Sequence, residues 1–250
     1  MLSETGNIND IFFEGVYKDV WKKLILPGLS EAECDYIQEV ANLQQQDKVL
    51  DLMCGYGRHA IELAKRDMQV TAVDNLADYT AEINSTAKEL NLSLETITSN
   101  ALDVHLQGQY KAVVCMGNSF AFFDRKDAVA LLKKIAAHLQ ADGVLIINSW
   151  MIAEIAIRHF QEKDWHELDG YKYLMNYQFY FQPSRIESEH TIIAADGSIE
   201  VIKGVDYIFT LAELEAMLNE AGLTTKMIHS TPRKRIFKFG DSRIYIVAGK

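Results

Sequence analysis

The chain has 250 residues, of which 48% are hydrophobic and 24% are charged, a composition typical of globular proteins and not of disordered ones. Its 25 lysines and arginines are outnumbered by 35 aspartates and glutamates, so the net charge is −10. Because cationic side chains must neutralise the phosphates of a nucleic acid or an anionic membrane, this balance disfavours both partners. The chain is therefore expected to act on neither.

The cysteines and the amino terminus give expectations about location. Cys34, Cys54 and Cys115 are widely spaced and do not have the spacing of metal ligands, which favours a reducing compartment and no metal site. The amino terminus lacks a basic region followed by an apolar run, and no apolar stretch reaches roughly 18 residues. We therefore expect a cytoplasmic protein without a membrane-spanning helix.

The first half of the chain predicts a parallel α/β sheet. Two helices, Glu14–Leu26 and Glu31–Leu43, are expected within an amino-terminal segment of residues 1–45. Between residues 48 and 150, short apolar runs alternate with longer amphipathic ones such as the helix predicted over Asp127–Leu139. The apolar runs, each typical of a buried strand, are Lys48–Met53, Gln69–Val73, Leu94–Thr98, Lys111–Met116 and Val144–Asn148. This alternation predicts right-handed βαβ units and a doubly wound, mostly parallel sheet.

After residue 150 the pattern changes to antiparallel strands. A helix over Ile152–Gln161 precedes three extended runs, of which the last two are joined by the hairpin signal Asp196-Gly197. The three runs are Tyr171–Tyr180, Arg185–Ala194 and Ser198–Phe209. They predict an antiparallel insertion at about 171–209 within a single domain of residues 1–250. A helix capped by Thr210 and two strands, Thr224–His229 and Ser242–Ala248, are expected to return to the parallel sheet.

The most informative segment is the glycine-rich turn that follows the first predicted strand. Asp51 lies near the end of the strand, Gly55 and Gly57 form the turn, and Asp74 ends the next strand 19 residues after Gly55. Glycine allows the turn to adopt positive φ and lets a ligand approach the backbone. A carboxylate at this distance is typical of one that accepts the ribose hydroxyls of a nucleoside cofactor.

This segment resembles the first motif of class I methyltransferases that depend on S-adenosylmethionine. Asp51-Leu52-Met53-Cys54-Gly55-Tyr56-Gly57 is similar to the motif D-L-G-C-G-x-G, and Cys115 to Phe120 lie where the family has its fourth motif. The run Gly117-Asn118-Ser119-Phe120 is similar to that of glycine/sarcosine N-methyltransferases. The resemblance covers roughly residues 46–150 and 207–250. It implies a seven-stranded Rossmann-like sheet and S-adenosylmethionine as the cofactor.

The resemblance also implies roles for individual residues. The residues expected at the cofactor are Tyr17, Asp51, Met53, Cys54, Gly55, Gly57, Arg58, Asp74, Asn75, Asn100, Ala101 and Met116. Asn118 and Ser119 are expected to orient the acceptor as catalytic residues, and Phe120, Tyr173 and Tyr177 to contact it. Two assignments stay open, because Tyr17 can instead pack against neighbouring aromatic residues and Arg58 can instead pair with a surface acid.

Two positions depart from the pattern of the family. Met53 stands where the family has its first glycine, so the backbone at Met53 is expected not to lie far into positive φ. Asn100 stands where the family usually has an aspartate at the adenine ring, and its amide oxygen can still accept a hydrogen bond from an exocyclic amine. Each change is expected to weaken cofactor binding by about 1 kcal/mol.

These residues favour methyl transfer to a small-molecule acceptor, with an amine preferred over a hydroxyl. The insertion is expected to cover the substrate site, and the chain to be a monomer or a homodimer. One alternative is a nicotinamide-dependent oxidoreductase, because residues 55–60 also fit the pattern G-x-G-x-x-A. The acid Asp51 beside a pyrophosphate disfavours that reading. A second alternative is a methyltransferase-like binding protein without catalytic activity.

Overall fold

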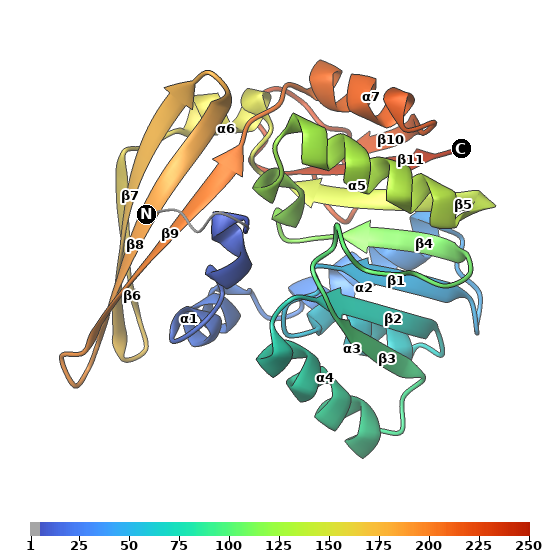
Figure 1. Cartoon of the computed structure of the whole chain (residues 1–250), viewed down its shortest axis with the longest axis horizontal. Coiled ribbons are helices and arrows are strands. Elements are labelled where there is room, and N and C mark those ends of the chain that lie inside the picture. The colour runs from blue at the N-terminus through green and yellow to red at the C-terminus, as the bar shows by residue number, and fades with distance from the viewer. Residues whose placement is uncertain (1–5) are drawn as a thin grey trace.

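The computed structural model describes residues 6–250 and shows a seven-stranded sheet with helices on both faces, beside a separate four-stranded sheet (Figure 1). Two short 3-10 helices, η1 (Ile8–Ile11) and η2 (Ser119–Phe122), accompany the regular elements. The α-helices are α1 (Tyr17–Leu24), α2 (Leu29–Val40), α3 (Arg58–Lys65), α4 (Ala77–Glu89), α5 (Arg125–His138), α6 (Ala153–His159) and α7 (Leu211–Glu220). The strands are β1 (Lys48–Leu52), β2 (Gln69–Asp74), β3 (Leu94–Thr98), β4 (Tyr110–Cys115), β5 (Leu139–Ser149), β6 (Lys163–Leu168), β7 (Tyr171–Phe181), β8 (Ser184–Ala194), β9 (Ile199–Tyr207), β10 (Thr224–His229) and β11 (Ile244–Gly249).

The large sheet has the strand order β10-β11-β5-β4-β1-β2-β3. β1 pairs in parallel with both β2 and β4, whereas β11 runs antiparallel to its neighbours β5 and β10. The central strands are covered on both faces, and Val49, Leu50 and Leu52 of β1 are fully buried. This burial explains why they read as continuous apolar runs. The predicted doubly wound, mostly parallel sheet is confirmed.

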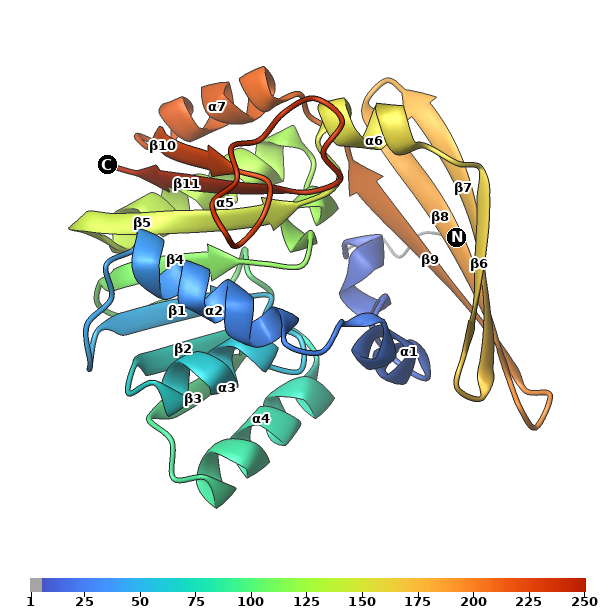
Figure 2. The same ribbon diagram turned by 180° about the vertical axis from the view of Figure 1, so that it is seen from behind.

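Helices pack on both faces of this sheet. α5 and α7 lie on one face (Figure 1), and α2 and α3 lie on the other (Figure 2). α5 begins after Asp124, whose side chain accepts a hydrogen bond from the Asp127 backbone N–H at 2.9 Å. Its stripe of Leu131, Leu132 and Ile135 is fully buried. Burial of three such side chains contributes roughly 1.5–3 kcal/mol each, which fixes this helix on the sheet.

The predicted antiparallel insertion is the four-stranded sheet β6-β7-β8-β9. Its β8–β9 hairpin turns at Asp196-Gly197, where Gly197 has a φ of 84°. β6 was not predicted, because most of its residues are exposed and many are charged, so it lacks the apolar alternation of a half-buried strand. An exposed edge strand of this kind gains its conformation from pairing with β7.

η1 and α1 lie between the two sheets in both views (Figures 1 and 2). The Asn9 side chain exchanges two hydrogen bonds with the backbone of Val205 in β9, at 2.8 and 2.9 Å. The Asn7 side chain donates to the carbonyl oxygen of Phe122 at 2.7 Å. The predicted helix over residues 14–26 is too long at both ends, because α1 begins at Tyr17, after Gly15 with a φ of 63°, and ends at Leu24, before the extended backbone of Ile25.

Other boundaries differ slightly from those predicted. β5 begins at Leu139, earlier than the predicted Val144, because a bulge near Tyr110 lets it continue pairing with β4. β11 begins at Ile244, two residues after the predicted start. No helix within residues 6–250 is both long enough and apolar enough to cross a bilayer.

Candidate active site

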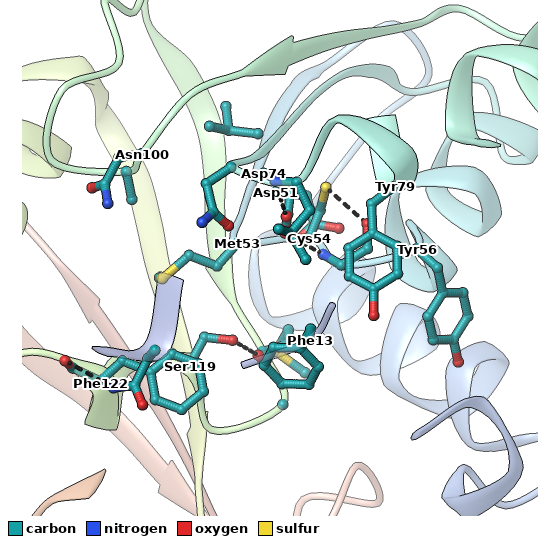
Figure 3. Close-up of a pocket in the computed structure, with 18 of the residues that line it drawn as sticks. Phe13, Asp51, Met53, Cys54, Tyr56, Asp74, Tyr79, Asn100, Ser119 and Phe122 are labelled. Carbon is teal, nitrogen blue, oxygen red and sulfur yellow. Dashed lines mark hydrogen bonds between the residues drawn. The ribbon is translucent and has the colours of Figure 1, made fainter. Parts of the chain in front are cut away.

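The first cavity lies at the carboxyl ends of β1, β2 and β4, where open parallel sheets bind ligands (Figure 3). Its volume is about 80 Å³. Most of the residues predicted at the cofactor line it, namely Asp51, Met53, Cys54, Gly55, Arg58, Asp74, Asn75, Asn100, Ala101 and Met116. They lie in or beside the four loops that follow β1, β2, β3 and β4. The fold therefore brings residues that are far apart in the sequence to one cavity.

The β1–α3 loop is held in a tight turn by its neighbours. Gly57 has a φ of 78°, and a Cβ atom built there would lie 2.5 Å from Ile83 Cγ1, so no larger residue fits. The Asp74 carboxylate accepts hydrogen bonds from the backbone N–H groups of Gly55 at 2.8 Å and Leu76 at 3.0 Å. Burial raises the pKa of Asp74, and these hydrogen bonds oppose that rise. The carboxylate therefore fixes the loop at the rim of the cavity.

Met53 corrects one expectation from the sequence. Its φ is 55°, so the backbone lies in the left-handed region that the sequence analysis predicted it would avoid. The loop imposes this conformation whatever the residue, since Cys54 N–H donates to the Val73 carbonyl oxygen at 3.0 Å on the neighbouring strand. The Met53 side chain lines the cavity and packs against the core. Packing thus offsets a backbone cost of roughly 1–2 kcal/mol.

Two polar atoms in this cavity have no hydrogen-bond partner among the described residues, Asp51 Oδ2 and the Tyr79 hydroxyl. Both are buried, and a buried polar group without a partner costs about 1–3 kcal/mol. Burial raises the pKa of Asp51 to about 7, although Arg58 opposes the rise. A ligand that presents hydrogen-bond donors or a positive charge would satisfy both atoms.

Arg58 and His59, which line the cavity at the start of α3, share one buried acid behind it. Glu33 Oε2 lies 2.6 Å from Arg58 Nη1 and 2.9 Å from His59 Nε2, and Oε1 accepts from the Tyr245 hydroxyl at 2.7 Å. Burial alone would raise the pKa of Glu33, but His59 and Arg58 outweigh it and lower the pKa to about 2. Arg58 therefore pairs with a buried acid and not with the surface acid considered from the sequence.

The amino-terminal segment forms the outer wall of the cavity. Asn100 Nδ2 donates to Asp10 Oδ1 at 3.0 Å, and Asn75 Nδ2 donates to the Asp10 carbonyl oxygen at 2.6 Å. Both asparagines are thus engaged with η1. Their contacts close the side of the cavity where the resemblance places the adenine ring.

A second cavity of about 180 Å³ lies between the two sheets. It adjoins the first, since Asn9, Phe13, Trp21, Gly117 and Phe122 line both. Tyr17, Tyr173 and Tyr177 line only this second cavity of the two, together with His190 and Asp206. The structure therefore places Tyr17 on the side away from Asp74, where its ring lies 5.8 Å from that of Tyr173.

The predicted catalytic residues lie where the two cavities meet. Asn118 lines the second cavity and Ser119 the first. Asn118 Oδ1 accepts from Ser149 Oγ at 2.8 Å, and Ser119 Oγ donates to the Met116 carbonyl oxygen at 3.0 Å. Phe120, predicted at the acceptor, instead lies in the core beneath the large sheet and lines neither cavity.

The sequence analysis did not predict Asp206 as a site residue. It lies on β9 deep in the second cavity, where its Oδ1 accepts from Asn118 Nδ2 at 3.0 Å. Burial raises its pKa to about 7, and this hydrogen bond opposes the rise. Alternation along β9 places Asp206 on the same face as Gly204 and Ile202. Because Glu200 shares this row, an acid there was not a distinct signal, and the sequence alone did not single out Asp206.

Comparison with known proteins agrees with this geometry. A family model described as "Methyltransferase domain" matches residues 49–143. The glycine/sarcosine N-methyltransferase of Aphanothece halophytica is 28% identical over 149 residues, covering 58% of this chain and 56% of that protein. The corresponding enzyme of Halorhodospira halochloris is 26% identical, covering 58% and 55%. Over this region the chain is similar to class I S-adenosylmethionine-dependent methyltransferases.

Solved structures show the same fold across nearly the whole chain. An S-adenosylmethionine-dependent methyltransferase from Clostridium acetobutylicum superposes with a TM-score of 0.81 at 16% identity, covering 94% of this chain and 96% of that one. The CcbJ methyltransferase from Streptomyces caelestis gives a TM-score of 0.81 at 18% identity, with 97% of each chain covered. The chain spans about half the length of the curated relatives that it matches. No cluster of three potential metal ligands occurs within residues 6–250.

Proposed function

We propose that this chain transfers a methyl group from S-adenosylmethionine to an amine nitrogen of a small molecule. The observation that carries the proposal is the pair of adjoining cavities, of which the first is built from the motif loops of the family and the second from the insertion and the amino-terminal segment. The relatives named above are glycine/sarcosine N-methyltransferases, which supports an amine acceptor.

The residues of the first cavity fit the cofactor of the family. Asp74 offers carboxylate oxygens to the ribose hydroxyls, and the unpartnered Asp51 Oδ2 and Tyr79 hydroxyl offer partners to polar groups of the ligand. Asn100 and Ala101 lie where the resemblance places the adenine ring.

S-adenosylmethionine supplies a methyl group bonded to a positively charged sulfur. The residues around the junction of the cavities can position an acceptor beside it, and positioning supplies most of the rate in a displacement of this kind. We propose that Asn118 and Ser119 orient the acceptor side, with Asn118 acting through Asp206. Aromatic rings from α1 and the insertion would exclude water and face the positive charge.

The proposal is tested by binding and by transfer. Equilibrium dialysis against S-adenosylmethionine, S-adenosylhomocysteine and NAD should show binding of the first two and none of NAD. Methylated products should then form from a mixture of small amines in the presence of methyl-labelled S-adenosylmethionine. Binding of NAD alone would support the oxidoreductase alternative, and cofactor binding without transfer to any amine would contradict the proposed acceptor.

A further inference from the structure

The second cavity contains one acid and no lysine or arginine among the residues that line it. The only hydrogen bond to the Asp206 carboxylate from the described residues comes from Asn118 Nδ2, and it engages Oδ1. Asp206 is half-buried and its side chain faces the cavity, so Oδ2 can receive a donor from a ligand. Asp206 is therefore the one group lining this cavity that can offer a negative charge to a ligand.

Aromatic side chains surround the same space. The rings of Tyr17, Tyr173 and Tyr177 gather around His190, each with its centre within 5.8 Å of the imidazole. His190 Nδ1 shares a hydrogen bond with the Tyr173 hydroxyl, and burial lowers the pKa of His190 to about 4, so the imidazole is neutral at pH 7. The ring of Tyr173 stacks on both His190 and His166. Aromatic rings attract cations, and no lysine or arginine in the lining competes with a ligand for the rings of Tyr17 and Tyr177.

We infer that the second cavity binds a small amine that lacks a carboxylate, held as its ammonium ion by Asp206 and the rings of Tyr17 and Tyr177. This inference rests on the proposed function and narrows its acceptor. A carboxylated amine such as glycine or sarcosine would place its own anion near Asp206 without a cationic partner, and a buried unpaired charge is strongly disfavoured. The acceptor of this chain thus differs from those named for its relatives.

Asp206 can also accept a proton from the amine. An ammonium ion has no lone pair, so it must lose one proton before its nitrogen can form a bond to carbon. The Asp206 carboxylate accepts that proton and becomes a carboxylic acid, and later releases the proton to water. The neutral nitrogen then forms the C–N bond while the C–S bond breaks, and the electron pair of that bond remains on sulfur.

The size of the cavity limits the acceptor. A dry protein cavity of about 150 Å³ accommodates a benzene ring, so 180 Å³ suits a molecule with one small ring or a short branched chain. Benzylamine and cyclohexylamine are therefore suitable probes. Benzyl alcohol and cyclohexanol are their neutral counterparts, and benzoate is an anionic one.

The test uses wild type, Asp206→Asn and the control Glu189→Gln, which removes a negative charge from β8 of the same sheet outside both cavities. Asparagine can still accept the hydrogen bond from Asn118, so Asp206→Asn should fold. Each protein is titrated calorimetrically with the five probes, glycine and sarcosine, with and without saturating S-adenosylhomocysteine. Wild type and Glu189→Gln should bind each amine at least tenfold more tightly than its alcohol, and should not bind benzoate, glycine or sarcosine.

Asp206→Asn should lose that tenfold preference while keeping the affinity of the wild type for S-adenosylhomocysteine. The inference is overturned if neither amine binds wild type, if the preference survives in Asp206→Asn, or if sarcosine or benzoate binds as tightly as the amines. Failure of the proposed function is a separate result, because it would appear as absent cofactor binding or absent transfer while the preference for amines is still measured directly.

Discussion

The two cavities are built in opposite ways. The first is assembled from loops that follow β1, β2, β3 and β4, and the acid behind it, Glu33, has partners on both carboxylate oxygens. The second is assembled from η1, α1 and the four-stranded sheet, and its acid, Asp206, receives one hydrogen bond. Their pKa values follow, at about 2 for Glu33 and about 7 for Asp206. A buried acid with all its partners supplied by the protein stabilises the fold, whereas one with a spare oxygen can serve a ligand.

The largest effect on stability is expected when Glu33, the acid with partners on both oxygens, is changed. Glu33→Gln should lower the free energy of unfolding by about 3–5 kcal/mol, because it leaves the buried Arg58 without its counter-charge. Urea denaturation measures this difference. Glu220→Gln, which removes an exposed acid paired with Arg125, is the matched control and should change stability little.

The same substitution should change the pH dependence of stability. The pKa of Glu33 in the folded chain, about 2, lies below its ordinary value of 4.5. Its contribution is therefore complete above pH 4.5 and is lost as the pH falls toward 2. Denaturation curves between pH 5 and pH 2 should show a steeper loss for wild type than for Glu33→Gln, and parallel losses would contradict the assignment.

Asp74→Ala should weaken binding of S-adenosylhomocysteine by about 1.5–3 kcal/mol, since it removes a charged acceptor from the rim of the first cavity. Isothermal titration gives the affinity. Asp74 also accepts from Gly55 and Leu76, so the melting temperature of the variant is needed as well. A folded variant with unchanged affinity would remove Asp74 from the cofactor site.

Tyr177→Ala should affect the second cavity alone. We expect at least a tenfold loss in kcat/KM for an amine acceptor, about 1.4 kcal/mol, because the ring excludes water and faces the ammonium ion. The affinity for S-adenosylhomocysteine should stay within twofold of wild type. Parallel losses in both quantities would show that Tyr177 contributes to binding of the cofactor as well as of the acceptor.

The smallest effect concerns the backbone of Met53. Because its φ is 55°, Met53→Gly should be more stable than Met53→Ala by about 1 kcal/mol, since both lose the packed side chain but only alanine keeps the steric cost of a Cβ. Thermal unfolding of the two variants makes the comparison. A more stable alanine variant would mean that the loop relaxes out of the left-handed conformation.

The first cavity was predictable because its contacts are local in the sequence. The turn at Gly55 and the carboxylate of Asp74 belong to consecutive strands, and the rule that ligands bind at the carboxyl edge of a parallel sheet brings them together. Met53 and Tyr17 were exceptions there, since Tyr17 lines the second cavity instead. The φ of a single residue depends on how the neighbouring strand holds the loop, and Met53 itself gives no sign of it.

The second cavity was predictable only in part because its walls meet across long separations. Asn9 contacts Val205, 196 residues away, and Asn118 contacts Asp206, 88 residues away. Tyr173 and Tyr177 could be assigned to one face of a strand by alternation, but not the cavity that this face would line. Asp206 lines the second cavity only because β9 folds against the segment that contains Asn118, and no local sequence pattern predicts that contact.

The central claim is that cofactor and acceptor occupy adjoining cavities at the same time. A crystal structure of the chain with S-adenosylhomocysteine and benzylamine tests this claim most directly. We expect the ribose hydroxyls at Asp74 in the first cavity and the amine nitrogen within hydrogen-bond distance of Asp206 Oδ2 in the second. Benzylamine in the first cavity, S-adenosylhomocysteine in the second, or mutual exclusion of the two ligands would contradict the account.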